Sequence, residues 1–249
     1  MQPQVQQPVA PLFTRRALVR LIIPLVIELF LLMTVGMADT VMVTSAGETA
    51  VSGVSLVDQI NTLIIQVFAA LSTGGAVVVS QYLGREEREN ANTAARQLLY
   101  AALAVSGALT LLALVLRGHI LALIFGQVEP AVMDSALVYF LLTALAYPFI
   151  AVYNAGAALF RSMGNSKVSM FCSLIVNIIN IAVNAILIYG FDMGAAGAGI
   201  GTLVSRIAAA VIVLALLRQP DNTVQASGLL PLRFQWRMVR RILFIGVPT

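Results

Sequence analysis

Six long apolar stretches dominate the sequence and limit what this chain can fold into. They cover roughly residues 18–43, 53–79, 94–116, 136–160, 169–189 and 194–217. A helix needs about 20 mostly apolar residues to cross a bilayer, and each stretch meets that length. Hydrophobic residues make up 59% of the chain and charged residues only 10%, too few to cover a compact fold in water. The sequence therefore predicts an all-α integral membrane protein whose core is a bundle of six transmembrane helices.

The polar segments divide the chain into four parts. Residues 1–14 are polar and proline-rich, which predicts a disordered cytoplasmic lead. Residues 15–218 form the six-helix amino-terminal lobe, with short separators and a longer one near RGHILALIFGQVEP. Residues 219–237 form a cytoplasmic linker. Residues 238–249 are the truncated start of a second lobe, because RRILFIGVP at 240–248 repeats the pattern of RALVRLIIP at 16–24. We expect the chain to be the first half of a longer protein, since transporters are commonly built from such repeats.

The basic residues predict the orientation of the bundle. With the amino terminus in the cytoplasm, thirteen of the fifteen basic residues fall on the cytoplasmic side, Arg117 lies outside, and Arg206 lies within the sixth stretch. Cytoplasmic loops carry such an excess of Lys and Arg. We therefore predict a multi-pass protein of the cell membrane with a cytoplasmic amino terminus. The bias also explains the net charge of +4 without a nucleic-acid partner.

Few residues in the sequence can support enzymatic chemistry. The chain has one cysteine, Cys172, and one histidine, His119, so it can form neither an internal disulfide nor a Cys/His metal cluster. It contains no HExxH motif. We predict a protein that is not an enzyme and needs no cofactor.

Two acids interrupt the first apolar stretch. Glu28 and Asp39 are eleven residues apart, almost three turns, so both can lie on one helix face about 16 Å apart along the axis. Acids at membrane depth usually face a protein interior or water. Asp39 could take up a proton or hold a sodium ion, or it could simply reach interfacial water near the helix end. Pro24 is expected to bend this helix.

The fifth stretch carries a row of amides. Asn177, Asn180 and Asn184 follow the spacing i, i+3, i+7 and lie on one face of an otherwise aliphatic helix. Amide oxygens can ligate hard cations, which would make the row part of an ion or substrate site. Alternatively, the amides form hydrogen bonds that hold neighbouring helices together.

The fourth and sixth stretches add further polar candidates. The fourth carries Tyr139, Tyr147 and Asn154, which could line a substrate cleft, and Pro148, a second expected bend. Tyrosines can also form a belt at the membrane interface. The sixth opens with Gly197 and Gly201, a G-x-x-x-G step that permits close helix approach. Thr202 follows these glycines, and Arg206 lies one turn further and needs an acid or carbonyl partner.

Four segments resemble the multidrug and toxic compound extrusion (MATE) family of efflux transporters. They are PLVIELFLLMTVGMADTVMV, LSTGGAVVVSQYLG, PFIAVYNAGAALFRSMGNSK and NIINIAVNAILIYGFDMGAAGAGIGTLVSR. The resemblance covers essentially residues 15–249. It implies a twelve-helix transporter of two six-helix lobes, of which this chain is the amino-terminal lobe plus the start of the seventh helix. It also implies export of small, often cationic, organic compounds by antiport with protons or sodium, through alternating access.

The resemblance also implies which residues couple ion movement to export. Asp39 matches the family's coupling aspartate, and Asn180 and Thr202 match its cation site, so these three form a candidate sodium site. Asn184 is the fourth candidate coupling residue and stands where some members have an aspartate, so a sodium site would keep it as a neutral ligand but lose one negative charge and should be weaker. Because an amide cannot bind a proton at working pH, Asp39 would carry protons alone in this lobe. Glu28, Tyr139, Tyr147, Asn154 and Asn177 are weaker candidates for the substrate cleft.

Three other functions are weaker alternatives. A lipid-linked oligosaccharide flippase can share this architecture, but it should place several basic residues inside the membrane, where this chain has only Arg206. A membrane-embedded enzyme would need a nucleophile–base pair, a metal cluster or two facing acids. A scaffold without transport activity would not need an acid and a row of amides at membrane depth.

Overall fold

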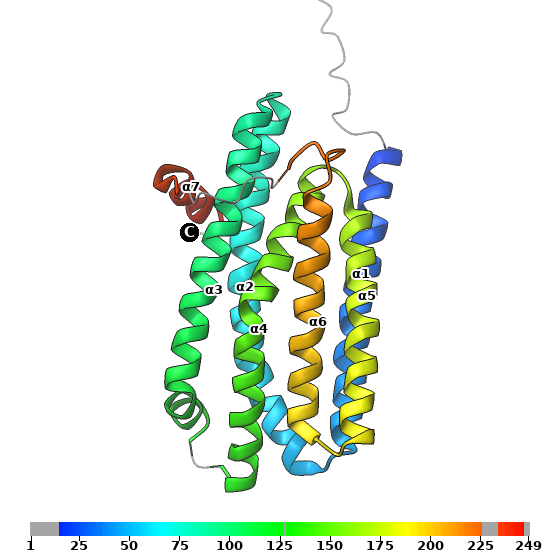
Figure 1. Cartoon of the computed structure of the whole chain (residues 1–249), viewed down its shortest axis with the longest axis vertical. Helices are drawn as coiled ribbons and strands as arrows, with labels where there is room; N and C mark the ends of the chain where they lie inside the picture. Colours follow the sequence, from blue (N-terminus) through cyan, green and yellow to red (C-terminus); the bar gives the residue numbers. More distant parts are fainter. Residues whose placement is uncertain (1–14, 127, 226–233, 247–249) are drawn as a thin grey trace, which may run out of the picture.

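The computed structural model describes residues 15–126, 128–225 and 234–246. Within these ranges the chain is a bundle of long helices without strands (Figure 1). The helices are α1 (Arg15–Thr44), α2 (Glu48–Gly84), α3 (Arg88–Phe125), α4 (Pro130–Ser162), α5 (Ser166–Ala185, continued by a π-helical turn at Ile186–Gly190), α6 (Gly194–Leu217) and α7 (Trp236–Gly246).

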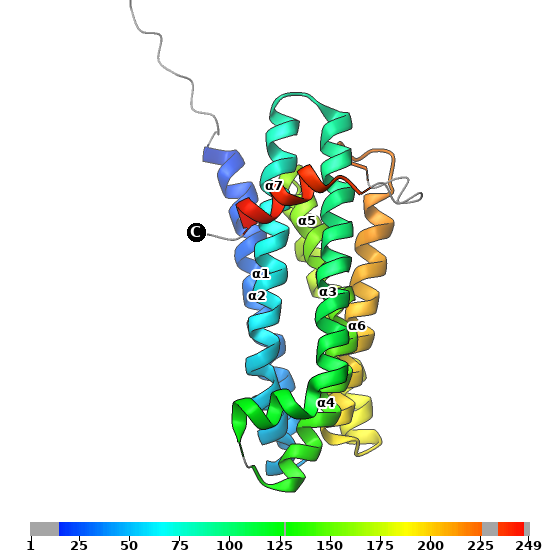
Figure 2. The same cartoon turned by 90° about the vertical axis from the view of Figure 1, so that its left-hand side faces the viewer.

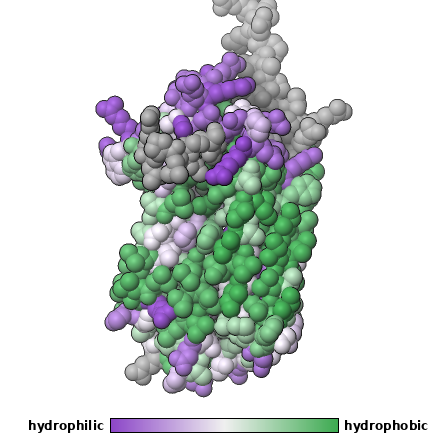
Figure 3. Space-filling model, in the orientation of Figure 1, coloured by the Kyte–Doolittle hydropathy of each residue, from purple (hydrophilic) through white to green (hydrophobic). Residues whose placement is uncertain are grey.

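Six of these helices are long and apolar enough to cross a membrane, counting only the described part of the chain. They coincide with the six predicted stretches, which confirms the predicted fold class. On the face shown in Figure 3, a broad hydrophobic band lies between two more polar ends. The helices continue through Pro24 and Pro148, which lie inside α1 and α4.

The predicted separator near RGHILALIFGQVEP is wrong in its extent, because α3 continues to Phe125. The segment HILALIF is apolar enough to stay helical, and only Gly126, with a φ of 67°, ends the helix. The last turns of α3 run sideways at the end of the bundle opposite the start of α1 (Figure 2). Helices α2 and α3 also extend further than the others at the opposite end (Figure 1).

A seventh helix is present, as predicted, but it begins at Trp236, inside the predicted linker of residues 219–237, and does not run parallel to the others. Helix α7 has eleven residues and lies across α2 and α3 (Figure 2). Its buried residues are Val239, Ile242 and Gly246, which repeat at the spacing of one helix face. Residues 1–14, the predicted lead, lie outside the described residues, as do 226–233 of the predicted linker and 247–249 of the predicted second lobe.

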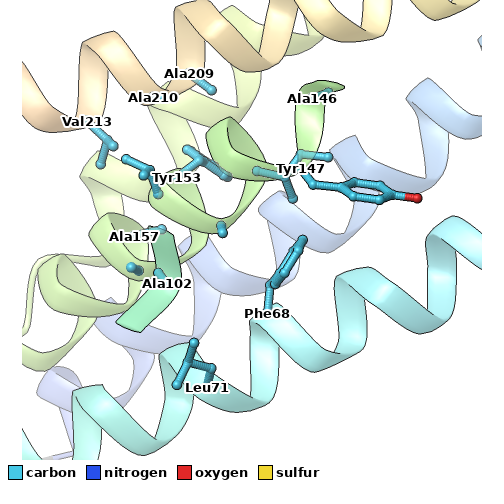
Figure 4. Packing of buried hydrophobic residues seen from close by; sticks show 14 of the residues in the cluster. Phe68, Leu71, Ala102, Ala146, Tyr147, Tyr153, Ala157, Ala209, Ala210 and Val213 are labelled. Carbon is cyan, nitrogen blue, oxygen red and sulfur yellow. The ribbon is translucent and has the colours of Figure 1, made fainter. Parts of the chain in front are cut away.

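Helix α4 occupies the centre of the bundle and contacts α2, α3, α5 and α6. Small side chains allow the neighbouring helices to approach α4 closely. Close packing matters here, because the hydrophobic effect does not drive helices together within lipid. Gly156 packs against Val213 of α6, and Gly53 of α2 packs against the backbone of α4. Figure 4 shows Phe68 and Tyr147 side by side within the buried cluster, and their rings meet edge to face with the ring centroids 6.1 Å apart.

Helix α5 buries its serines and asparagines and exposes large apolar residues such as Phe171, Ile175 and Ile178. Asn177, Asn180 and Asn184 are all buried, which confirms that they share one face. Cys172 is buried on the same helix. Helix α1 is the most peripheral of the six, and most of its large apolar side chains are exposed to the surroundings of the bundle.

Replacing Gly53 by alanine is expected to destabilise the bundle. The added methyl group would lie 2.8 Å from the backbone nitrogen of Ala136 and 2.9 Å from the carbonyl oxygen of Val132, neither of which can move without shifting α4. Overpacking of this kind costs about 1–3 kcal/mol. Thermal unfolding of the purified protein in detergent measures the loss. Gly107→Ala in α3 is the matched control, because nothing lies within 4 Å of the added methyl group. Equal loss in both variants would contradict the packing argument.

Candidate functional site

A cavity of about 190 Å³ lies between α1, α2, α4 and α6. Apolar residues such as Leu32, Val54 and Ile65 form part of its wall. The polar side chains that line it include Asp39 from α1, Asp58 and Asn61 from α2, Tyr139 and Tyr147 from α4, and Thr202 and Arg206 from α6. The cavity therefore brings together residues from four helices that are widely separated in the sequence.

Asp39 is tied to the row of amides on α5. Its Oδ1 accepts a hydrogen bond of 2.7 Å from Nδ2 of Asn184. The same amide group donates to Oδ1 of Asn180 at 3.4 Å. Asn184 is fully buried and Asp39 is half-buried, so the carboxylate forms the polar boundary between the cavity and the interior of the bundle. Three of the four predicted coupling residues thus form one connected chain.

The G-x-x-x-G step at the start of α6 makes room for this chain. A methyl group at Gly201 would collide with the carboxamide oxygen of Asn184, and one at Gly197 would lie 3.2 Å from Leu187. Any side chain at position 201 would displace Asn184 from Asp39. The Oδ1 of Asn184 is buried against this glycine and has no hydrogen-bond partner among the described residues.

A second acid of the cavity, Asp58, was missed by the sequence analysis. It lies on α2, is exposed to the cavity, and accepts a hydrogen bond of 3.0 Å from the Tyr139 hydroxyl. Asn61 donates to the same carboxylate oxygen at 3.4 Å and accepts a bond of 2.8 Å from the Tyr147 hydroxyl. The pattern that could have revealed Asp58 is the segment DQIN, in which an acid and an amide lie three residues apart inside the second apolar stretch.

Thr202 and Arg206 complete the polar lining from α6. The Thr202 hydroxyl interacts with that of Tyr139. Of the two partners expected for Arg206, an acid or a carbonyl, an acid within salt-bridge distance is not found, since the salt bridge among the described residues joins Arg161 to Glu28. The Nε of Arg206 is buried without a hydrogen-bond partner in the described part of the chain. Asp39 is near enough only for longer-range attraction.

Glu28 on α1 and Asn177 on α5, two of the weaker candidates for the substrate cleft, lie outside the cavity. One carboxylate oxygen of Glu28 lies 3.8 Å from Arg161, and the other accepts a hydrogen bond of 2.9 Å from Ser169. Asn177 donates to the carbonyl oxygen of Leu31 at 3.1 Å. Neither residue lines the cavity, and neither does Asn154. Glu28 and Asn177 hold α1 against its neighbours.

The polar groups near Asp39 are oxygen and nitrogen groups. Among the described residues, the cavity lining contains carboxylate, hydroxyl and amide side chains and neither cysteine nor histidine. No group of three or more His, Cys, Asp or Glu residues lies close enough to hold a metal within the described ranges. The free Oδ1 of Asn184 could serve as a ligand after a flip of its amide, whose nitrogen now faces Asp39.

The Asp39–Asn184 bond is expected to contribute measurably to stability. A hydrogen bond to a charged group is worth about 1.5–3 kcal/mol. Asp39→Asn, Asn184→Ala and the double variant, compared by thermal unfolding, should give a coupling energy of about 1 kcal/mol or more. The control cycle pairs Asp39→Asn with Asn177→Ala, because Asn177 bonds to the Leu31 carbonyl and not to Asp39. Additive effects in both cycles would show that the bond adds nothing to stability.

Comparison with known proteins places this arrangement in context. A sequence model of the MatE family matches residues 24–186. The chain is 30% identical over 233 residues to the uncharacterized transporter YisQ of Bacillus subtilis. This match covers 91% of the chain and 50% of YisQ. It is 28% identical over 242 residues to the probable multidrug resistance protein NorM of Thermotoga maritima, covering 94% of the chain and 51% of NorM.

Solved structures show the same fold. The chain superimposes on MATE in its bent conformation with a TM-score of 0.85 at 22% identity, covering 93% of the chain and 51% of that protein. It superimposes on the outward-facing conformation of a multidrug resistance MATE family transporter with a TM-score of 0.84 at 23% identity, covering 93% and 51%. The chain thus spans about half the length of the proteins that it matches.

Proposed function

Because this chain belongs to the MatE family of membrane transporters, we propose that it forms the amino-terminal lobe of an exporter of small organic cations. Export is driven by inward movement of a proton or a sodium ion. The observation that carries the proposal is the polar cavity between α1, α2, α4 and α6, with a carboxylate at its edge. A bundle that only supported other proteins would gain nothing from this cavity, because polar groups at membrane depth are costly.

The second wall of the transport pathway comes from a carboxy-terminal lobe. The relatives that match are about twice as long as this chain, which supports a two-lobe protein. The amino-terminal lobe alone would leave one side of the substrate pathway open to lipid. We therefore assign transport to the pair of lobes and not to this lobe by itself.

Asp39 binds the coupling cation in this proposal. A proton would bind its carboxylate directly, since the neighbouring Asn184 cannot take one up. A sodium ion would use the carboxylate together with neutral oxygens of Asn180 and Thr202, and Asn184 after a flip of its amide. Either cation neutralises the acceptor of the hydrogen bond from Asn184, which joins α1 to α5.

Ion binding would thereby change how firmly α1 is held to α5. A ligand shifts a conformational equilibrium only by its different affinity for the two states. The ionised carboxylate favours the state in which Asn184 donates to it, and the occupied carboxylate no longer needs that donor. Alternating access would use this difference, with the lobes rocking around the central cleft and the Pro24 and Pro148 regions as bending points.

A lipid-linked oligosaccharide flippase is not favoured. The relatives include the probable multidrug resistance protein NorM of Thermotoga maritima and the multidrug export protein MepA of Staphylococcus aureus. Pyrophosphate recognition would also call for several basic side chains, and Arg206 supplies the basic group that lines the cavity in the described part of the chain. The site is therefore better suited to cations than to anions.

We further propose that the protein lies in the cell membrane with its amino terminus in the cytoplasm. Thirteen of the fifteen basic residues fall on one side of the predicted bundle, which supports this orientation.

Transport of a fluorescent organic cation tests the proposed function. The complete gene product, reconstituted in proteoliposomes, should drive efflux under an imposed proton gradient or an imposed sodium gradient. Asp39→Asn should reduce this efflux by about tenfold or more, since the amide neither binds a proton nor carries a charge for sodium. Asp134→Asn is the control, because Asp134 lies at the exposed start of α4 and outside the cavity. Efflux unchanged in Asp39→Asn would move coupling to the other lobe, and no efflux under either gradient would overturn the proposal.

A further inference from the structure

The cavity holds two carboxylates in different surroundings. Asp39 is half-buried and bonded to the amide of Asn184. Asp58 is exposed to the cavity, and both of its hydrogen bonds, from Tyr139 and from Asn61, engage the same oxygen, Oδ1. One carboxylate is therefore built into the helix interface, whereas the other is fixed in orientation and open to a ligand.

The third charged group of the cavity is Arg206. Its guanidinium stays protonated under all ordinary conditions. It forms no salt bridge with either acid, and its buried Nε has no hydrogen-bond partner among the described residues. The charge of Arg206 is thus unpaired at close range, and the lining as a whole carries one net negative charge when both acids are ionised.

One net negative charge limits what the cavity can hold. Charges interact more strongly where water is scarce than they do in bulk water. A single monovalent cation brings the cavity to neutrality. A second cation would leave an uncompensated positive charge at membrane depth, which is unfavourable.

We propose that Asp58 is a specificity-determining residue that binds the positive group of a monovalent organic substrate, while Asp39 binds the coupling cation, and that the shared net charge admits only one of the two at a time. This inference rests on the proposed function and adds the group that recognises the substrate. Tyr139 is a positioning residue, since its hydroxyl holds the Asp58 carboxylate. Exclusion by charge makes the exchange one for one, because the substrate leaves the cavity when the coupling cation enters.

Binding of radiolabelled tetraethylammonium to the complete gene product in lipid nanodiscs tests the role of Asp58. Asp58→Asn should weaken binding by about tenfold or more, because it removes the charge that faces the ligand. Asp58→Glu keeps the charge and should stay within about threefold of the unaltered protein. Tyr139→Phe should weaken binding severalfold, as expected for the loss of one orienting hydrogen bond. Asp134→Asn should leave binding unchanged.

Arg206→Gln tests the limit of one cation. In the unaltered protein, protons or sodium should compete with tetraethylammonium. Removing the guanidinium changes the net charge of the cavity from one negative charge to two, so both cations should bind together and the competition should disappear. Competition that persists in Arg206→Gln would overturn exclusion by charge and point to direct overlap of the two ligands. Gel filtration and thermal unfolding establish that each variant is folded.

The outcomes separate this inference from the proposed function. The role of Asp58 would be overturned if the Asp58→Asn variant bound tetraethylammonium as tightly as the unaltered protein, even if ion-driven efflux is observed. Absence of any binding to the unaltered protein would overturn it as well. Binding that depends on Asp58 without ion-driven efflux would support the site and contradict the proposed coupled export.

Discussion

The attachment of α1 to α5 is the interaction on which the candidate site depends. Most of the large apolar side chains of α1 are exposed, so few of them pack inside the bundle. The attachment therefore relies on polar contacts along α5, from Ser169 to Glu28, from Asn177 to the Leu31 carbonyl, and from Asn184 to Asp39. The last of these contacts also fixes the carboxylate at the edge of the cavity, so the same bond serves the architecture and the site.

The sequence was sufficient for the features that depend on local composition. Each span was visible as an apolar stretch, and the amide row on α5 was visible from its helical spacing. The close approach of α6 followed from Gly197 and Gly201, and the structure adds that the space at Gly201 is occupied by the Asn184 side chain. The end of α3 was misplaced because Arg117, Gly118 and His119 look like a boundary, whereas the apolar residues beyond them continue the helix to Phe125.

Features that depend on contacts between segments distant in the chain could not be predicted from the sequence. Asp58 gains its importance from Tyr139, which is 81 residues away, and Asp39 from Asn184, which is 145 residues away. Periodicity places a residue on a helix face but does not say which helix that face meets. The same reason explains Arg206, for which the sequence indicated a need for a partner, while the structure places it in the cavity without a close acid.

The burial of Cys172 has a practical consequence for studying motion in this bundle. It is the only thiol in the sequence and lies inside α5, where a bulky maleimide has little access. A cysteine introduced at an exposed position can therefore be labelled selectively without first removing a native one. A spin label on α1 and another on α2 would report the separation of the two helices under different ionic conditions, in a protein that is otherwise unaltered.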